Sequence, residues 1–225
     1  MKNIIIAITL IIFSCGISIA QSTLQVNIED CRQESSFEYL SEFKIYKNGT
    51  LFKTIEPKHE SKQIIKNLAF GKYKIEYKTM FKRTENINIE ISEKKKYSVD
   101  LCLNYINYDS ESYKPFIDLL KNGEEYSIQV SSQGCFHSTD EKITITRKVD
   151  KYYLNYGATN KLLNNANIKA IREFEIELNY MESFGCTTSD TYVVKYKKKE
   201  VKISDGSCSW NGDYYLKKKL NLTKE

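Results

Sequence analysis

Apolar and polar residues alternate along four segments in the first half of the chain. These segments are residues 24–28, 73–77, 87–91 and 97–103. A period of two, with a polar residue at every second position, is typical of a strand that buries one face. No helical repeat of useful length interrupts these segments. Several short strands with turns between them predict an antiparallel β-sandwich in this half.

The dipeptide Asn48-Gly49 predicts a tight turn in the same half. It separates the apolar segments 43–45 and 51–55. Both residues tolerate the positive φ angles that a two-residue hairpin turn needs. The pattern therefore predicts a β-hairpin centred on these two residues.

The second half mixes strand signals with one helix signal. Alternation predicts strands at residues 126–130, 143–146 and 152–156, and a hairpin with arms at 192–196 and 200–203. Between them, apolar residues recur every three or four positions, as they do on one face of a helix. This stripe consists of Ile168, Ile171, Phe174, Leu178 and Met181. A helix packed on the sheet is the expected result.

The helix has cap candidates near both ends. Asn164, Asn165 and Asn167 suit its start, and Gly185 suits a stop beyond its end. The acidic residues expected mostly off its apolar face are Glu173, Glu175 and Glu177. A terminal apolar segment follows at residues 216–222. The predicted fold class is therefore mainly β with an α+β part: an N-terminal antiparallel β-sandwich followed by an antiparallel sheet with one main helix.

Residues 43–55, followed by Asn67-Leu68-Ala69-Phe70-Gly71-Lys72-Tyr73-Lys74-Ile75, carry a family resemblance. A leucine, a glycine and a tyrosine in this spacing, leading into a strand, resemble the carboxypeptidase-regulatory-like (transthyretin-like) β-sandwich domains. The resemblance covers residues 21–103, although Phe70 stands where the family commonly has proline. It implies a structural or binding module without catalytic residues. Segments 134–137, 185–188 and 205–212 are similar to features of uncharacterised secreted bacterial proteins.

The N-terminus has the parts of a secretory signal peptide. Lys2 precedes the apolar run at residues 4–12, and Ser18-Ile19-Ala20 fits the small-x-small cleavage rule. We expect a mature chain that starts at Gln21. The apolar stretch is short for a membrane span, which needs about 20 predominantly apolar residues. The alternative is a lipoprotein signal, with a lipid anchor on Cys15.

Both interpretations predict an exported bacterial protein that is periplasmic, cell-surface or extracellular. Lys, Ile, Asn and Tyr are abundant while Pro and Gly are scarce, as in proteins from AT-rich bacterial genomes. The whole chain has 34 basic and 29 acidic residues, a net charge of +5. Removal of Lys2 with the signal peptide leaves the mature chain with a net charge of +4. The two signs are interspersed, which is typical of a solvated surface. This distribution argues against a nucleic-acid footprint, which needs clustered basic charge.

Five cysteines remain in the mature chain, and an exported chain is expected to form disulfides. Cys31 and Cys102 lie on the polar phase near the first and last predicted strands of the sandwich, so we expect them to pair. Cys186 and Cys208 lie at nearly equal distances from a turn centred on Lys198, so we expect a second pair. Cys135 then remains a free thiol. The competing arrangement pairs Cys135 with Cys186 and leaves Cys208 free.

The cysteines also provide the alternative chemistry. Cys135, His137, Cys186 and Cys208 have the donor types of a zinc site, but they lack paired Cys-x-x-Cys spacing. Cys135 and His137 are two positions apart, and on a strand this spacing places both side chains on one face. An imidazole beside a thiol can activate it as a nucleophile. We treat a metal or thiol site as the alternative to simple disulfide formation.

Trp210, Tyr214 and Tyr215 are the candidate ligand contacts. They lie on or beside a loop that a disulfide at Cys208 would tie, and rigid aromatic side chains give a large contact area at low entropic cost. The contact requires an exposed Trp210. If Trp210 instead closes the hydrophobic core, the named contact is lost.

We therefore predict an exported, non-enzymatic binding or envelope-associated protein that uses no cofactor. Its expected partner is an extracellular protein or a glycan, with no nucleic acid and no transmembrane span. The expected division is a signal peptide at 1–20, a β-sandwich at 21–103, a linker at 104–114 and an α+β domain at 115–225. The alternatives are a thiol- or metal-dependent protein centred on Cys135 and His137, or a secreted inhibitor of another enzyme.

Overall fold

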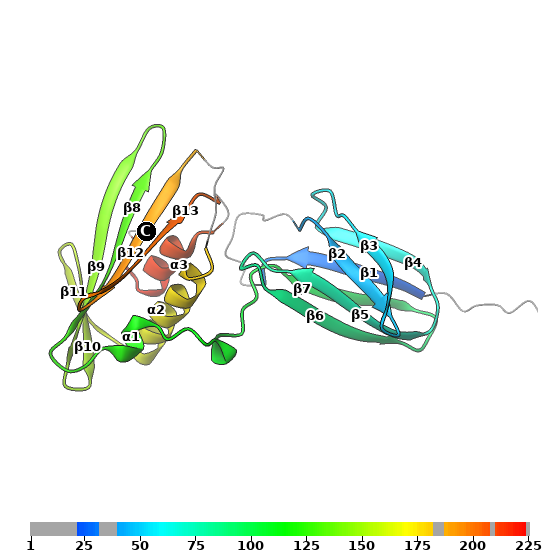
Figure 1. Ribbon diagram of the computed structural model, residues 1–225, viewed down its shortest axis with the longest axis horizontal. Coiled ribbons are helices and arrows are strands. Elements are labelled where there is room, and N and C mark those ends of the chain that lie inside the picture. Colours follow the sequence, from blue (N-terminus) through cyan, green and yellow to red (C-terminus); the bar gives the residue numbers. More distant parts are fainter. Residues whose placement is uncertain (1–21, 32–39, 182–186, 208–209, 224–225) are drawn as a thin grey trace, which may run out of the picture.

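The computed structural model describes residues 22–31, 40–181, 187–207 and 210–223 (Figure 1). The predicted signal peptide, Cys186 and Cys208 lie outside these ranges, so the expectations about them stay predictions. The described chain forms a two-sheet unit, followed by a third sheet with helices. It is mainly β with one main helix, which confirms the predicted fold class.

The first unit is a sandwich of two sheets. One sheet has the strand order β4-β1-β7 and the other has the order β3-β2-β5-β6. The strands are β1 (Ser22–Glu29), β2 (Phe43–Lys47), β3 (Thr50–Ile55), β4 (Lys62–Leu68), β5 (Gly71–Lys78), β6 (Thr84–Ile91) and β7 (Lys96–Cys102). The alternating apolar residues form one core, which includes Leu24, Val26, Ile45, Ile75 and Leu101. Burial of these side chains stabilises the sandwich.

Strand pairing in the sandwich follows the sequence pattern with one exception. Asn48 and Gly49, between β2 and β3, have φ angles of 49° and 84°, as the predicted hairpin turn requires. The exception is that β1 and β7 run parallel, with Val26 opposite Val99. Parallel neighbours need a long connection, and strands β2 to β6 provide it. The sandwich is therefore antiparallel in most of its pairings but not in all.

A disulfide joins Cys31 to Cys102 at the end of the parallel pair. Glu29 lies opposite Cys102 in the β1–β7 register, so the two cysteines are close neighbours. Their Cα atoms are 5.2 Å apart, within the usual range for a disulfide. This is the pairing that the sequence predicts. Because the cysteines are 71 positions apart, the bond closes nearly the whole sandwich.

The second unit is a six-stranded antiparallel sheet, with the described helices packed on one face. The strand order is β11-β10-β9-β8-β12-β13. The strands are β8 (Glu125–Gln133), β9 (Ser138–Lys148), β10 (Lys151–Tyr156), β11 (Thr159–Leu163), β12 (Ser189–Tyr196) and β13 (Lys199–Asp205). The helices are α1 (Phe116–Leu119), α2 (Asn165–Leu178) and α3 (Gly212–Lys219). Figure 1 shows α2 and α3 on the side of this sheet that faces the sandwich.

Helix α2 begins at the predicted cap. The Asn164 side chain accepts a hydrogen bond from the Asn167 amide at 2.9 Å, and the Asn167 side chain accepts one from the Asn164 amide at 3.1 Å. This reciprocal pair satisfies two amides at the helix start. The helix ends at Leu178, three residues earlier than the apolar stripe predicted, although Met181 is still buried. Within the described ranges, no helix is long and apolar enough to cross a bilayer.

Three details of the second unit differ from the sequence-based expectation. Strand β11 was not expected, because residues 159–163 do not alternate. The terminal apolar segment belongs mostly to helix α3, which begins earlier, at Gly212. Tyr196 pairs with Lys199, so the β12–β13 turn is centred between Lys197 and Lys198 and not on Lys198.

The turn between β5 and β6 packs into the core of the second unit. Phe81 in this turn is 1% exposed and belongs to the hydrophobic core of the six-stranded sheet and its helices, together with Ile106. Arg83 Nη1 lies 2.8 Å from a carboxylate oxygen of Glu111 and donates a hydrogen bond of 3.1 Å to the Tyr180 hydroxyl. The segment predicted as a linker, 104–114, is therefore packed between the units. The domain boundaries themselves stay a prediction.

Candidate functional site

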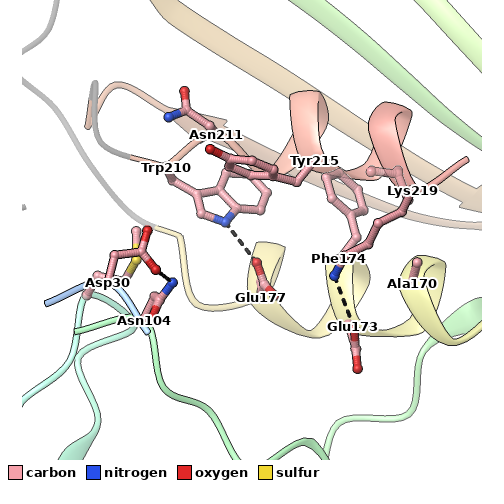
Figure 2. A pocket seen from close by; sticks show the side chains of 13 residues that line it. Asp30, Asn104, Ala170, Glu173, Phe174, Glu177, Trp210, Asn211, Tyr215 and Lys219 are labelled. Carbon is pink, nitrogen blue, oxygen red and sulfur yellow. Dashed lines mark hydrogen bonds and ion pairs between the residues drawn. The ribbon is translucent and has the colours of Figure 1, made fainter. Parts of the chain in front are cut away.

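Trp210, the single tryptophan of the chain, lies in the core beside α2. Its ring stacks on Phe174 with 5.5 Å between centroids and meets Tyr192 edge-on at 5.3 Å. Its Nε1 donates a hydrogen bond of 3.0 Å to the Glu177 carboxylate (Figure 2). Only 5% of Trp210 is exposed, so the indole offers no open face to a ligand. The ligand contact expected of an exposed Trp210 is therefore lost, because this side chain closes the core.

A small pocket lies next to Trp210, between the two units (Figure 2). Asp30 and Asn104 form one wall and are hydrogen-bonded to each other. On the opposite wall, the Lys219 ammonium lies 3.7 Å from Glu173. The pocket volume is about 30 Å³, which has room for ordered water. Ligand sites usually have volumes of about 300–1,000 Å³. This pocket is therefore too small for a ligand and is a gap in the packing between the two units.

The two candidate tyrosines lie at the start of α3. Tyr214 is 53% exposed, whereas Tyr215 is half-buried and lines the small pocket. Their ring centroids are 5.2 Å apart, with the ring planes at 79°. Tyr214, Tyr215 and Trp210 therefore lie in three different environments and do not form one aromatic surface. A binding role for the two tyrosines stays a prediction.

Glu175 on α2 is 2% exposed and accepts four hydrogen bonds. The amides of Phe116 and Ile117 donate at 2.5 and 3.4 Å, and the hydroxyls of Tyr113 and Tyr126 donate at 2.9 and 3.2 Å. Burial raises the pKa of the Glu175 carboxyl, while these donors act in the opposite direction. The carboxyl thus fixes the start of α1 against α2, which is a structural role.

Sequence reasoning missed that Glu175 and Glu177 are buried. Glu175 lies four residues after Ile171 and three before Leu178, so the helical period itself signals its place on the packed side. Glu177 is 4% exposed and also accepts a hydrogen bond of 2.5 Å from the Tyr108 hydroxyl. The Tyr108 and Trp210 donors lie 69 and 33 positions away in the sequence. No local pattern signals contacts over such separations.

Three aspartates, on β12, β13 and α3, lie near enough to Tyr192 for their charges to act on its hydroxyl. Asp190 on β12 lies opposite Asp205 on β13 and is 3.5 Å from the Tyr192 hydroxyl. Asp213 on α3 forms an ion pair of 2.8 Å with Lys217. Burial raises the pKa of both Asp205 and Asp213. Burial, followed by the negative charge of the aspartates, raises the pKa of Tyr192 as well.

Cys135 and His137 lie in the turn between β8 and β9. The Gly134 amide donates a hydrogen bond of 3.0 Å to the His137 carbonyl, which closes the turn. His137 Nε2 lies 3.1 Å from the Ser132 hydroxyl, and the Cys135 thiol is free and exposed. The pair is therefore in a turn, so the strand spacing that predicted a shared face does not apply. The imidazole contacts Ser132 instead of the thiol.

The metal alternative depends on cysteines outside the described residues. Within the described ranges, no group of three or more His, Cys, Asp or Glu side chains is arranged to hold a metal ion. Cys186 and Cys208 lie beyond those ranges. The Cys186–Cys208 disulfide, the competing Cys135–Cys186 pair and the four-residue metal site with His137 all stay predictions.

The six-stranded sheet has one face that the described helices do not cover. Side chains on a strand alternate between faces, and Tyr126, Ile128 and Val130 of β8 point into the core under the helices. The residues between them point to the opposite side, which we call the outward face. Strand register aligns its residues in cross-strand rows: Thr144–Ser127–Lys195–Glu200, Lys142–Gln129–Val193–Lys202 and Asp140–Ser131–Thr191–Ser204.

Hydroxyl, amide and charged groups make up most of the outward face. Gln129 Nε2 and the Ser131 hydroxyl donate to Asp140 at 3.0 and 3.2 Å. Lys195 Nζ lies 3.0 Å from a carboxylate oxygen of Glu200. These bonds link neighbouring strands and order the polar side chains. The face is therefore a polar, hydrogen-bonding surface that is chemically unlike the apolar side under the helices.

No protein-family model and no curated protein matches the chain. Among solved structures, it is similar to the streptococcal ancillary pilin, with a TM-score of 0.30, 9% identity and coverage of 66% of this chain and 60% of that one. It is also similar to the Bacillus anthracis TIE protein, with a TM-score of 0.35, 12% identity and coverage of 83% and 31%. The chain thus spans less than two thirds of each of these proteins, and similarity at this level carries no functional argument.

Proposed function

We propose that the protein is an exported, non-enzymatic binding protein of the bacterial envelope, and that the outward face is its binding surface. The observation that carries this proposal is the placement of the helices on one side of the six-stranded sheet (Figure 1). Because α2 and α3 lie between this sheet and the sandwich, the outward face points away from the rest of the described chain. A partner can therefore approach it without displacing an element of the fold.

The disulfide supports the export part of the proposal. Disulfides form and persist in oxidising compartments, and Cys31 and Cys102 are joined. The signal-peptide pattern at residues 1–20 points in the same direction. A soluble exported protein and a lipoprotein anchored at Cys15 are both compatible with this role, and the mass of the mature protein distinguishes them.

The sandwich at residues 21–103 is proposed as a support module, as its resemblance to carboxypeptidase-regulatory-like domains implies. Phe81 is buried in the core of the second unit, and Arg83 is paired with Glu111. These contacts hold the sandwich against the helix side of the second unit. Contacts of this kind favour one fixed orientation of the second unit relative to the sandwich. The outward face would then keep a constant direction relative to an anchored N-terminus.

The proposal is tested by co-sedimentation of the purified mature protein with envelope fragments from the cells that export it. The test variant carries Thr144→Arg and Thr191→Arg, which place two long side chains on the outward face. The matched control carries Thr54→Arg on the exposed strand β3 of the sandwich. We expect the wild type and the control to sediment with the fragments, and the test variant to stay in solution.

Two results contradict this proposal. One is a wild-type protein that does not sediment with any envelope fraction, and the other is equal sedimentation of all three proteins. The variant Cys135→Ser tests the thiol alternative in the same assay. Binding through the outward face predicts unchanged sedimentation, because Cys135 lies in the β8–β9 turn, beyond the rows of the outward face.

A further inference from the structure

Two lysines of the outward face lack a carboxylate partner among the described residues. Lys142 on β9 and Lys202 on β13 are both exposed. The register places them at the two ends of one cross-strand row, with Gln129 and Val193 between them. Three strand spacings separate them, which corresponds to about 14 Å. The row therefore presents two separated positive charges with a short polar and apolar stretch between them.

The two neighbouring rows differ in how their charges are compensated. Lys195 is paired with Glu200 in the row on one side. In the row on the other side, Asp140 accepts hydrogen bonds from Gln129 and Ser131 and keeps its negative charge, because both donors are neutral. The central row itself carries only the positive charges of Lys142 and Lys202. The net charge of the whole chain, +5, has the same sign.

We propose that the outward face binds a carboxylate-bearing polysaccharide, with Lys142 and Lys202 contacting carboxylates on separate sugar units. This inference rests on the proposed function, because it uses the same surface. The hydroxyls of the half-buried Thr144 and Thr191 lie in the neighbouring rows. A hydroxyl both donates and accepts hydrogen bonds, as sugar hydroxyls do. The two lysines thus favour a polysaccharide with negative charges. The hydroxyls in the neighbouring rows can form hydrogen bonds with its sugar hydroxyls.

The spacing of the charges favours a polysaccharide over a nucleic acid. Duplex DNA carries one negative charge for about every 1.7 Å of its axis, and its partners need clustered basic residues. Polygalacturonate carries one carboxylate per sugar unit, and this wider spacing suits two lysines at opposite ends of a row. A protein partner would be expected to find aromatic or large apolar anchors, whereas the central row offers only Val193 as an apolar side chain.

The test measures binding of polygalacturonate to the full mature protein by titration calorimetry at low ionic strength. Dextran of similar length is the neutral probe. The test variant is Lys142→Gln with Lys202→Gln. The matched control is Lys53→Gln with Lys66→Gln, which removes the same charge from exposed positions on sandwich strands β3 and β4.

We expect the wild type and the control to bind polygalacturonate and not dextran. Loss of Lys142 and Lys202 is expected to weaken binding about tenfold, as for two exposed charge pairs, while the control changes affinity less than about twofold. Added salt should weaken wild-type binding more than binding of the test variant.

Equal binding of dextran and polygalacturonate overturns the inference, and so does equal weakening by the two double variants. Tighter binding of duplex DNA than of polygalacturonate overturns it in favour of a nucleic-acid surface. The outcome is separable from the proposed function. If Thr144→Arg with Thr191→Arg abolishes envelope sedimentation but the lysine variant binds polygalacturonate like the wild type, the outward face stands and its assigned ligand is wrong.

Discussion

The indole Nε1 of Trp210 donates a hydrogen bond of 3.0 Å to Glu177, a residue 33 positions earlier in the chain. The second carboxylate oxygen of Glu177 accepts a hydrogen bond of 2.5 Å from the Tyr108 hydroxyl. One buried carboxylate therefore joins helix α2, the segment that follows the sandwich and the loop before α3. A buried charge with several donors is stabilising only while those donors stay in place.

Glu177→Ala is predicted to destabilise the protein by about 3 kcal/mol, because it removes the acceptor of the buried Trp210 indole and of the half-buried Tyr108 hydroxyl. Urea unfolding monitored by Trp210 fluorescence measures the change. Glu173→Ala is the control on the same helix, since Glu173 makes only ion pairs of 3.7 Å with Lys169 and Lys219. The control is expected to cost under about 1 kcal/mol. Equal losses for the two variants contradict the role given to Glu177.

Gly212→Ala is predicted to disturb the packing of Trp210. A Cβ atom at Gly212 would lie 2.0 Å from Cζ2 of the indole, and the ring is already held by Phe174 and Tyr192. Overpacking of this kind costs about 1–3 kcal/mol. We expect lower thermal stability and a changed emission maximum of the single tryptophan. Lys218→Ala, on the exposed side of α3, should change neither quantity, and wild-type behaviour of Gly212→Ala would exclude this packing.

Removal of the Cys31–Cys102 disulfide is predicted to destabilise the sandwich by about 4 kcal/mol, given the 71-residue separation. The double variant Cys31→Ser with Cys102→Ser isolates this bond from any other disulfide. Urea unfolding followed by far-ultraviolet circular dichroism is the suitable measurement, because the only tryptophan lies in the second unit. An unchanged unfolding midpoint would mean that the bond does not constrain the unfolded chain.

The stability contributed by Asp205 is predicted to fall as the pH rises. Burial raises the pKa of this carboxyl above its ordinary value of 3.8, so the folded state retains the proton to a higher pH than the unfolded state does. The contribution is full below the ordinary value and is lost as the pH rises towards the raised folded value. Asp205→Asn should therefore gain stability relative to the wild type over this interval, while keeping a side-chain acceptor for the Ser207 amide.

This prediction is checked by urea unfolding of both proteins from about pH 4 to about pH 8. Burial also raises the pKa of the Asp213 carboxyl, but the ion pair with Lys217 lowers it and so opposes the effect of burial. Asp205 is therefore the clearer test. A stability difference between Asp205→Asn and the wild type that does not vary with pH contradicts the assignment.

The sequence predicts those parts of the fold that depend on local pattern. Alternation locates the strands that bury one face, Asn48-Gly49 locates a hairpin turn, and Asn164 caps α2. Strand β11 is missed because its residues do not alternate, and its place is set by pairing with β10. The parallel pairing of β1 with β7 is likewise a product of the whole sandwich.

The candidate site is less predictable than the fold. The sequence leaves open whether Trp210 contacts a ligand or closes the core. Phe174, Glu177 and Tyr192 decide this by enclosing the ring from distant positions. The outward face is visible only after the register of β9, β8, β12 and β13 is known, because Lys142 and Lys202 lie on different hairpins. Long-range pairing therefore decides which side chains are available for binding.

Protection of lysines from acetylation tests the central claim most directly. The mature protein is treated with acetic anhydride, free and bound to envelope fragments, and modification of each lysine is measured by mass spectrometry. Binding through the outward face predicts protection of Lys142 and Lys202, while Lys53 and Lys66 on the sandwich react equally in both states. Protection of the sandwich lysines with full reaction at Lys142 and Lys202 would contradict the assignment of the outward face.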